Sequence, residues 1–115
     1  MKFSAAKPNK FHAKKTEGDG IIFDSKKEAG RYGELLMESR AGLITGLVLQ
    51  PVYRIQEAFK RDGETVRAIV YRGDFGYFRD GRLVCEDSKG VRTEAYKLKR
   101  KLVLFRFPDV LFVES

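Results

Sequence analysis

At 115 residues the chain is long enough for one hydrophobic core but not for two, and a hydrophobic content of 43% excludes wholesale disorder. A net charge of +7 favours an anionic partner such as nucleic acid, although a basic surface can also serve solubility alone. No apolar run approaches the roughly 20 residues of a membrane helix, and residues 1–7 lack the apolar stretch of a signal peptide. One cysteine and one histidine exclude an internal disulfide and a Cys/His zinc cage. We therefore expect a cytoplasmic protein without a membrane segment.

Residues 1–20 are rich in lysine, contain Pro8 and show no apolar period. This pattern is typical of a flexible basic arm, so we place a single folded domain at residues 21–115. Lys14 and Lys15 of the arm are candidate contacts to nucleic-acid phosphates. The alternative is a solvated tail without a ligand.

A first helix is predicted over residues 26–40, after a short apolar run at residues 21–23. Ser25 is placed as its N-cap, with Glu28 three residues later as in a capping box, and Gly42 is a suitable C-terminal stop. Glu28 precedes Tyr32 by four residues and Leu35 by seven, so it lies at the rim of the buried side of the helix. The predicted apolar stripe consists of Ala29, Tyr32, Leu35, Leu36 and Leu43.

Three strands are predicted after this helix, as an antiparallel meander. The first covers residues 46–56 and contains Pro51, which suits an edge strand or a bulge. The second covers residues 66–78 and contains Asp74, and the third covers residues 83–89. Tight turns are predicted at the two Asp-Gly pairs, Asp62-Gly63 and Asp80-Gly81.

A second helix is predicted over residues 93–105, with a final buried strand at residues 110–113. Lys97, Arg100 and Lys101 lie towards its solvent side and are candidate phosphate contacts, the alternative being a solvated helix face. The predicted apolar stripe consists of Ala95, Leu98, Leu102 and Phe105. Together the elements predict a mixed α/β domain, in which one central mixed sheet is flanked by two helices and the last strand can pair in parallel.

Four polar residues occupy positions where apolar or turn residues are expected: Glu28, Asp74, Asp87 and Lys89. A hairpin brings Asp74 and Asp87 onto neighbouring strands, where two buried carboxylates repel each other and lose hydration. A divalent cation removes both problems, and Mg²⁺ prefers such oxygen ligands together with substrate phosphate. A lysine beside the cation can orient water or offset charge on the phosphate. This set predicts phosphodiester hydrolysis.

The same residues resemble the signature of the PD-(D/E)xK nuclease superfamily. That signature has an aspartate on the second strand, here Asp74, and acid-any-lysine on the third strand, here Asp87-Ser88-Lys89. An acid on the first helix, here Glu28, often joins it. The order helix, three strands, helix, strand is also the restriction-endonuclease-like αβββαβ core of that superfamily.

Further segments resemble a small phage and prophage family placed among Holliday-junction-resolvase-like endonucleases. The resemblance covers nearly the whole chain after residue 10. The segments that carry it are Ala13-Lys14-Lys15-Thr16, Phe23-Asp24-Ser25-Lys26-Lys27-Glu28-Ala29, Leu49-Gln50-Pro51, Glu86-Asp87-Ser88-Lys89-Gly90 and the helix start Thr93-Glu94.

The resemblance implies a DNA endonuclease that depends on Mg²⁺ or Mn²⁺. Glu28, Asp74 and Asp87 would hold the metal, and Lys89 would assist hydrolysis. The implied substrate is branched or Holliday-junction DNA in phage recombination or packaging, and a homodimer with paired active sites would suit a two-armed junction. The alternative function is a non-catalytic nucleic-acid-binding or phage accessory protein on the same fold.

At two positions the sequence does not decide which way the acidic side chains point. Gly73 stands where the superfamily is named for a proline, and a glycine there permits a bulge or a close backbone approach. A one-residue bulge would also exchange the faces of Glu86 and Asp87. The structural alternative is that Asp74 and Asp87 pair only with arginines such as Arg72.

Overall fold

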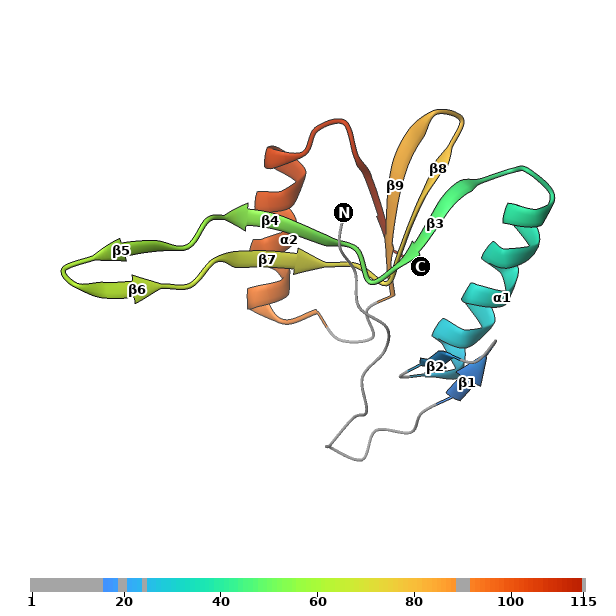
Figure 1. The fold of residues 1–115 in the computed structure, drawn as a ribbon, viewed down its shortest axis with the longest axis horizontal. Coiled ribbons are helices and arrows are strands. Elements are labelled where there is room, and N and C mark those ends of the chain that lie inside the picture. Colours follow the sequence, from blue (N-terminus) through green and yellow to red (C-terminus); the bar gives the residue numbers. More distant parts are fainter. Residues whose placement is uncertain (1–15, 19–20, 24, 89–91, 115) are drawn as a thin grey trace.

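The computed structural model describes residues 16–18, 21–23, 25–88 and 92–114, and within them it is a mixed α/β fold with a mixed sheet and two helices, as predicted (Figure 1). The elements are, in chain order, β1 (Thr16–Gly18), β2 (Ile21–Phe23), α1 (Lys26–Arg40), β3 (Thr45–Leu49), β4 (Val52–Gln56), β5 (Phe59–Arg61), β6 (Glu64–Val66), β7 (Ile69–Arg72), β8 (Phe75–Arg79), β9 (Arg82–Asp87), α2 (Glu94–Arg106) and β10 (Leu111–Glu114). No helix among the described residues has the length and apolar character needed to cross a bilayer.

Helix α1 has the predicted bounds, and its first turn forms as the sequence indicates. The Ser25 hydroxyl accepts a hydrogen bond from the Glu28 N–H at 3.1 Å, which satisfies one of the free N–H groups of the helix start. Tyr32 and Leu35 are buried in the core as expected. The prediction that Leu43 belongs to the apolar stripe is wrong, because Leu43 lies beyond the end of the helix and is 58% exposed.

The segment Thr16–Gly18, which falls within the predicted basic arm, forms a strand that pairs antiparallel with β2. Lys14 and Lys15 lie outside the described residues. Helix α1 packs near this small β1–β2 sheet and near β3 (Figure 1).

The main sheet has the strand order β10-β9-β8-β3. Strand β10 pairs parallel with β9 after the α2 crossover, which confirms the predicted parallel pairing, and the other neighbours are antiparallel. The two long strands predicted before β9 are each broken in the structure: β3 and β4 are separated at Gln50–Pro51, and β7 and β8 at Gly73–Asp74.

The two breaks lie opposite each other and form one bend in the meander. The Gln50 N–H donates to the Asp74 carbonyl at 2.9 Å, and the Gly73 N–H donates to the Pro51 carbonyl at 3.0 Å. Gln50 has a positive φ of 51°, which turns the chain between β3 and β4. The paired strands therefore change direction together, and Asp74 is placed at the corner.

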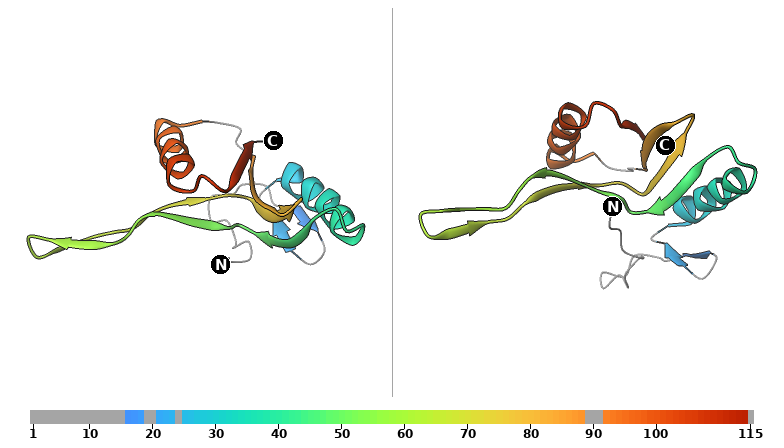
Figure 2. Two further views of the ribbon diagram at one scale, coloured as in Figure 1. Left: turned by 90° about the horizontal axis from the view of Figure 1, so that it is seen from above. Right: turned by 45° about the horizontal axis from the view of Figure 1, so that its top comes forward.

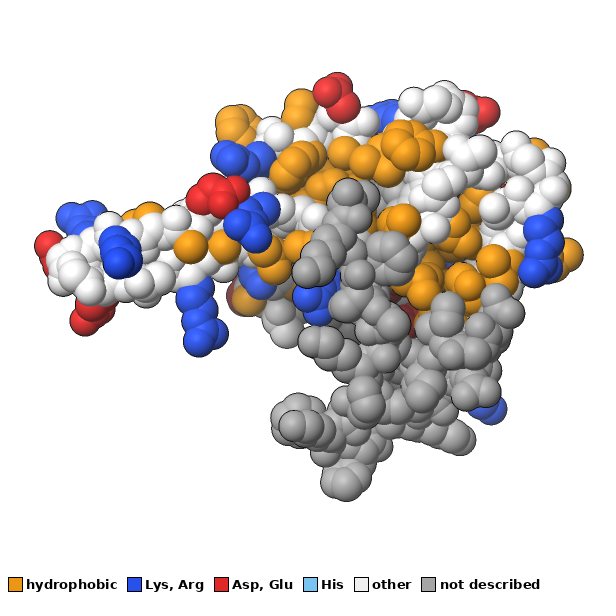
Figure 3. Space-filling model, viewed as in Figure 1, with side chains coloured by type: hydrophobic (Ala, Val, Ile, Leu, Met, Phe, Trp, Pro, Cys, Tyr) orange, Lys and Arg blue, Asp and Glu red, His pale blue; other side chains and the backbone are white. Residues whose placement is uncertain are grey.

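Beyond the bend, β4 and β7 continue into a hairpin whose tip is β5 and β6. Both views in Figure 2 show this tip extending away from the rest of the molecule, and all residues of β5 and β6 are exposed. The predicted Asp62-Gly63 turn closes it, with φ of 51° and 80° as a type I′ turn requires. Lys and Arg side chains project from the hairpin in Figure 3.

Two hydrophobic clusters lie on opposite faces of β9, because successive side chains of a strand alternate. Val84 belongs to the cluster beneath α1, which includes Phe23, Tyr32, Leu35, Ile44, Leu49, Phe75 and Tyr77. Cys85 belongs to the cluster beneath α2, which includes Tyr53, Ile55, Tyr71, Val103 and Phe112. The acidic residues that follow are therefore divided as well, with Glu86 on the α1 side and Asp87 on the α2 side.

The apolar stripe predicted for α2 is wrong. The helix buries Val103 and partly buries Tyr96, and Phe107 just after its end is also partly buried, whereas Leu98 is 59% exposed and Phe105 is 87% exposed. The helix begins close to the predicted residue 93, with Thr93 as its N-cap, and the Thr93 hydroxyl accepts a hydrogen bond from the Tyr96 N–H at 3.0 Å. The sequence offers two apolar stripes on this helix, and burial of Val103 against the sheet leaves the other one in solvent. Figure 3 shows hydrophobic side chains exposed around the C-terminal end of α2.

Candidate functional site

The corner residue Asp74 is held by the backbone on both of its sides. Its N–H donates to the Glu86 carbonyl at 2.8 Å, and its carbonyl accepts from the Gln50 N–H at 2.9 Å. The preceding Gly73 packs directly on β9, since a Cβ at this position would lie within 3.0 Å of the Cys85 sulfur and 3.1 Å from the Glu86 carbonyl oxygen. Of the two alternatives that a glycine permits, the structure has the close backbone approach, and this approach fixes where the Asp74 side chain begins.

The structure brings Asp74 next to Asp87. Phe75 pairs with Glu86 in the β8–β9 register, so the next position along places Asp74 beside Asp87. The Asp74 Oδ2 accepts a hydrogen bond from the N–H of Ser88, the residue after Asp87, at 2.6 Å. Burial first, and then the charges of Asp87 and Asp74, raise the pKa of the Cys85 thiol to about 12. Asp87 is two residues from Cys85 along β9, and Asp74 lies opposite Asp87, so both carboxylates are on the Cys85 side of the strand.

Asp87 is fully buried, and a tyrosine orients it. The Tyr71 hydroxyl donates to the Asp87 Oδ2 at 2.9 Å. Burial and the neighbouring Asp87 charge raise the pKa of Tyr71, so the phenol stays protonated and remains a donor. Sequence reasoning missed Tyr71, because its position opposite Asp87 depends on how β7 bends into β8.

The polar chain continues from this tyrosine towards the surface. The Tyr71 and Tyr96 rings lie 6.2 Å apart between centroids, and the Tyr96 hydroxyl donates to the Glu114 Oε2 at 2.7 Å. The other Glu114 oxygen forms an ion pair with Arg92 at 3.1 Å. Asp87 is thus the inner end of a row of polar groups that joins β7, α2 and β10.

Glu86 has a structural partner on the other face of the strand. Two nitrogens of the Arg31 guanidinium on α1 donate hydrogen bonds to the Glu86 carboxylate, at 2.8 and 2.6 Å, and the Tyr77 hydroxyl also donates to it. Burial alone would raise the pKa of Glu86, but the hydrogen bonds from Arg31 and Tyr77 and the Arg31 charge hold it below the usual range. The exchange of faces that a bulge would produce has not occurred.

Glu28 is not brought to this pair of acids. Its helix covers the Glu86 face, whereas Asp87 faces α2, and its backbone N–H serves the helix cap. Within the described ranges no group of three or more Asp, Glu, His or Cys side chains is arranged to hold a metal ion. The lysine of the predicted set, Lys89, lies outside the described residues.

The basic residues predicted on α2 have different surroundings. Lys97 and Lys101 are exposed, although Lys97 also lies 3.5 Å from Glu94. Arg100 does not lie on the solvent face as expected. It is half-buried and donates from Nη2 to the Phe112 carbonyl of β10 at 3.4 Å, so its guanidinium is turned towards the sheet.

The chain belongs to the DUF1064 family, described as a protein of unknown function, whose family model matches residues 8–113. No curated protein and no solved structure matches the chain.

Proposed function

We propose that this DUF1064 member is a DNA endonuclease that hydrolyses phosphodiester bonds with Mg²⁺ or Mn²⁺. The observation that supports it most strongly is the juxtaposition of Asp74 and Asp87, which are distant in sequence and joined through the Ser88 N–H. Each of the two acids accepts a hydrogen bond, but carboxylates that lie side by side repel each other, and burial of Asp87 carries a desolvation cost. A ligand that is positively charged explains why both are present.

The donor chemistry of the pair fits a hard divalent cation. Mg²⁺ is held in many sites by one or two carboxylates together with substrate phosphate, so a third protein ligand is not required. When bound, such a cation supplies charge neutralisation at the phosphate and lowers the pKa of water. We assign the metal to Asp74 and Asp87, and we place Glu28 outside the inner ligand set.

The chain's own groups have separate roles in this proposal. Asp74 and Asp87 would bind the metal ion. The Ser88 N–H fixes the orientation of the Asp74 carboxylate, and the Tyr71 hydroxyl fixes that of the Asp87 carboxylate. Lys89 is assigned to the attacking water or to the phosphate charge on the resemblance to PD-(D/E)xK nucleases. Glu86, with its Arg31 partner, ties α1 to β9 and takes no part in the reaction.

The order of elements supports a restriction-endonuclease-like core as part of the same proposal. Helix α1 is followed by three strands of a meander, namely the bent β3–β4, the bent β7–β8, and β9, and then by α2 and a parallel β10. This order is αβββαβ. The acids lie at the β8 start and the β9 end, where the resemblance expects them.

The exposed stripe on α2 supports a homodimer acting on branched DNA. Leu98, Leu102 and Phe105 follow each other at helical spacing and are 59%, 37% and 87% exposed. A two-fold axis across this helix would pack each stripe against its copy, since an isologous interface uses the same patch twice. Two active sites in one particle would match the two strands of a junction.

Cleavage of a panel of duplex, flapped and four-way DNA in Mg²⁺ or Mn²⁺ tests the proposed activity. The wild type should cut at least one of these substrates and should stop when the metal is chelated. Asp87→Asn should lose cleavage while still binding DNA. Asp62→Asn, the same change in the exposed hairpin turn, is the matched control and should cut like the wild type.

A wild type that retains DNA but cuts none of the substrates with either metal would contradict the endonuclease and favour a binding module. A wild type that neither cuts nor retains DNA would favour an accessory protein. DNA retention measured at increasing salt separates the binding module from the accessory protein, because contacts to phosphate weaken steeply as salt is raised.

A further inference from the structure

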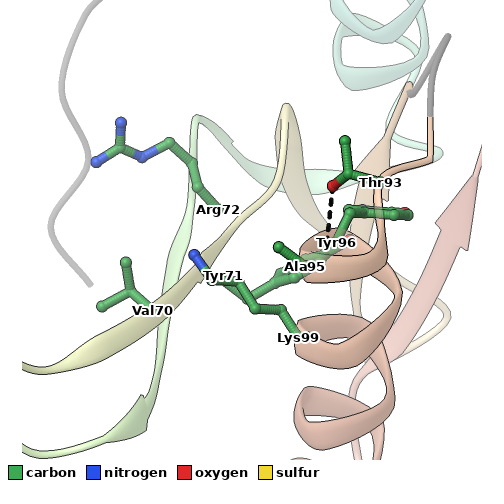
Figure 4. A pocket seen from close by; sticks show the side chains of 7 residues that line it. All are labelled: Val70, Tyr71, Arg72, Thr93, Ala95, Tyr96 and Lys99. Carbon is green, nitrogen blue, oxygen red and sulfur yellow. Dashed lines mark hydrogen bonds between the residues drawn. The ribbon is translucent and has the colours of Figure 1, made fainter.

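A pocket of about 530 Å³ lies between strand β7 and the first turns of α2 (Figure 4). This volume falls within the range of about 300–1,000 Å³ that is typical of small-molecule sites. Strand β7 and helix α2 provide its walls, and they contribute Val70, Tyr71, Arg72, Thr93, Ala95, Tyr96 and Lys99.

The pocket and the acidic pair share one residue. Tyr71 lines the pocket and also donates its hydroxyl to the Asp87 Oδ2 at 2.9 Å. A group bound in the pocket would therefore lie one side chain away from Asp87. The pocket is a separate site and also a neighbour of the proposed reaction centre.

The lining combines flat apolar surface with positive charge. Val70, Ala95 and the partly buried Tyr96 ring offer surface on which a nucleobase can lie, as bases commonly lie on aromatic side chains in single-strand binding proteins, whereas the Tyr71 ring is 2% exposed and belongs to the buried wall of the pocket. Two cations accompany this surface. Lys99 reaches from α2 towards β7, and Arg72 stands at the rim with its guanidinium directed away from α2 (Figure 4).

Neither cation is engaged elsewhere within the part of the chain that the structure describes. Arg72 and Lys99 form no ion pair there, in contrast to Arg31, Arg79 and Arg92, which are each paired with a glutamate. Free cations at an apolar pocket suit an anion that carries an apolar group. A nucleotide has both parts, with a phosphate for the cations and a base for the apolar surface.

We propose that this pocket holds one unpaired nucleotide of the DNA substrate, next to the phosphate that lies at Asp74 and Asp87. Its position beside a scissile bond rests on the proposed endonuclease function. A base in the pocket cannot remain in the duplex stack, so the enzyme should favour DNA with an unpaired nucleotide beside the cut. Flaps, splayed ends and junction branch points meet this condition, whereas continuous duplex requires a base to be extruded from the stack.

Binding of deoxyadenosine 5′-monophosphate, measured by calorimetry in EDTA, tests the pocket without any cleavage. The wild type should bind one molecule per chain, and should bind deoxyadenosine and inorganic phosphate more weakly. Lys99→Ala should weaken binding of the nucleotide about tenfold, since one charge-assisted hydrogen bond is lost. Ala95→Phe, which adds bulk to the pocket and leaves the charge unchanged, should also weaken it at least tenfold.

Lys60→Ala is the matched control, because it removes the same charge from the exposed strand β5, outside the pocket lining, and it should bind the nucleotide like the wild type. Equal weakening by Lys99→Ala and Lys60→Ala would overturn the proposal, as would the absence of saturable binding by the wild type. Circular dichroism shows whether each variant is folded.

The two proposals fail separately. A wild type that binds the nucleotide as described but cuts no DNA would overturn the endonuclease and leave the pocket in place. A wild type that cuts DNA but binds no nucleotide, or that cuts continuous duplex as fast as flapped DNA, would overturn the pocket and leave the endonuclease in place.

Discussion

Gly73→Ala tests the packing that positions the acidic pair. The new methyl group would lie within 3.0 Å of the Cys85 sulfur and 3.1 Å from the Glu86 carbonyl oxygen, and the Cys85 side chain is buried. Adding one methyl group to a tightly packed interior costs about 1–3 kcal/mol. We expect a loss of this size, because β7 or β9 must shift. Such a shift would also displace Asp74, so metal-dependent cleavage should fall with stability.

Urea unfolding followed by circular dichroism measures the loss, and a second substitution identifies its cause. Cys85→Ala removes the sulfur that the methyl group would meet. In the double variant the methyl group can fill the space that the sulfur leaves, so the two costs should not add. We expect a favourable coupling free energy of about 1–2 kcal/mol, within the range measured for residues in contact.

Gly33→Ala is the matched control, because a Cβ at that position meets no described atom within 4 Å. It lies in the middle of α1, where alanine is favoured over glycine by about 1 kcal/mol, so this variant should be more stable than the wild type. The reasoning is refuted if Gly73→Ala unfolds at the same urea concentration as the wild type, or if the double-variant costs add.

Two further predictions concern the other face of β9 and the surface of α2. The lowered pKa of Glu86 contributes stability that is present above its unfolded value of 4.5 and is lost as the pH falls through the folded value. The wild type should therefore lose more unfolding free energy than Glu86→Gln between about pH 5 and pH 2, and parallel curves would contradict this. Phe105→Asp should convert the proposed dimer to a monomer in light-scattering chromatography, and an unchanged mass would exclude α2 from the interface.

The sequence alone predicted those features that depend only on neighbouring residues, such as helix caps and tight turns. Ser25 caps α1 and Thr93 caps α2, because each has a hydroxyl three residues before an N–H that it accepts from. The Asp-Gly turns close their hairpins because glycine adopts the positive φ that such turns need. The convergence of Asp74 and Asp87 also followed from the meander, since a hairpin places them on adjacent strands.

The rest depends on contacts between distant elements. Helix α2 carries two apolar stripes, and only its docking on the sheet selects Val103 over Leu98 and Phe105 for burial. The broken strands arise at the bend, where backbone hydrogen bonds link Pro51 to Gly73. The pairing of Glu86 with Arg31, which separates it from the candidate site, joins residues on a helix and a strand that no sequence period connects.

The most direct test of the central claim is binding of Mn²⁺, measured by electron paramagnetic resonance with the full chain. The wild type should bind Mn²⁺ and so reduce the spectrum of the free ion. Asp74→Asn should not reduce this spectrum, whereas Asp62→Asn should reduce it as the wild type does. Asparagine can still accept the hydrogen bond from the Ser88 N–H, so the fold should persist in the first variant. Mn²⁺ binding of equal strength in Asp74→Asn, or none in the wild type, would contradict the claim that these acids are together to hold a cation.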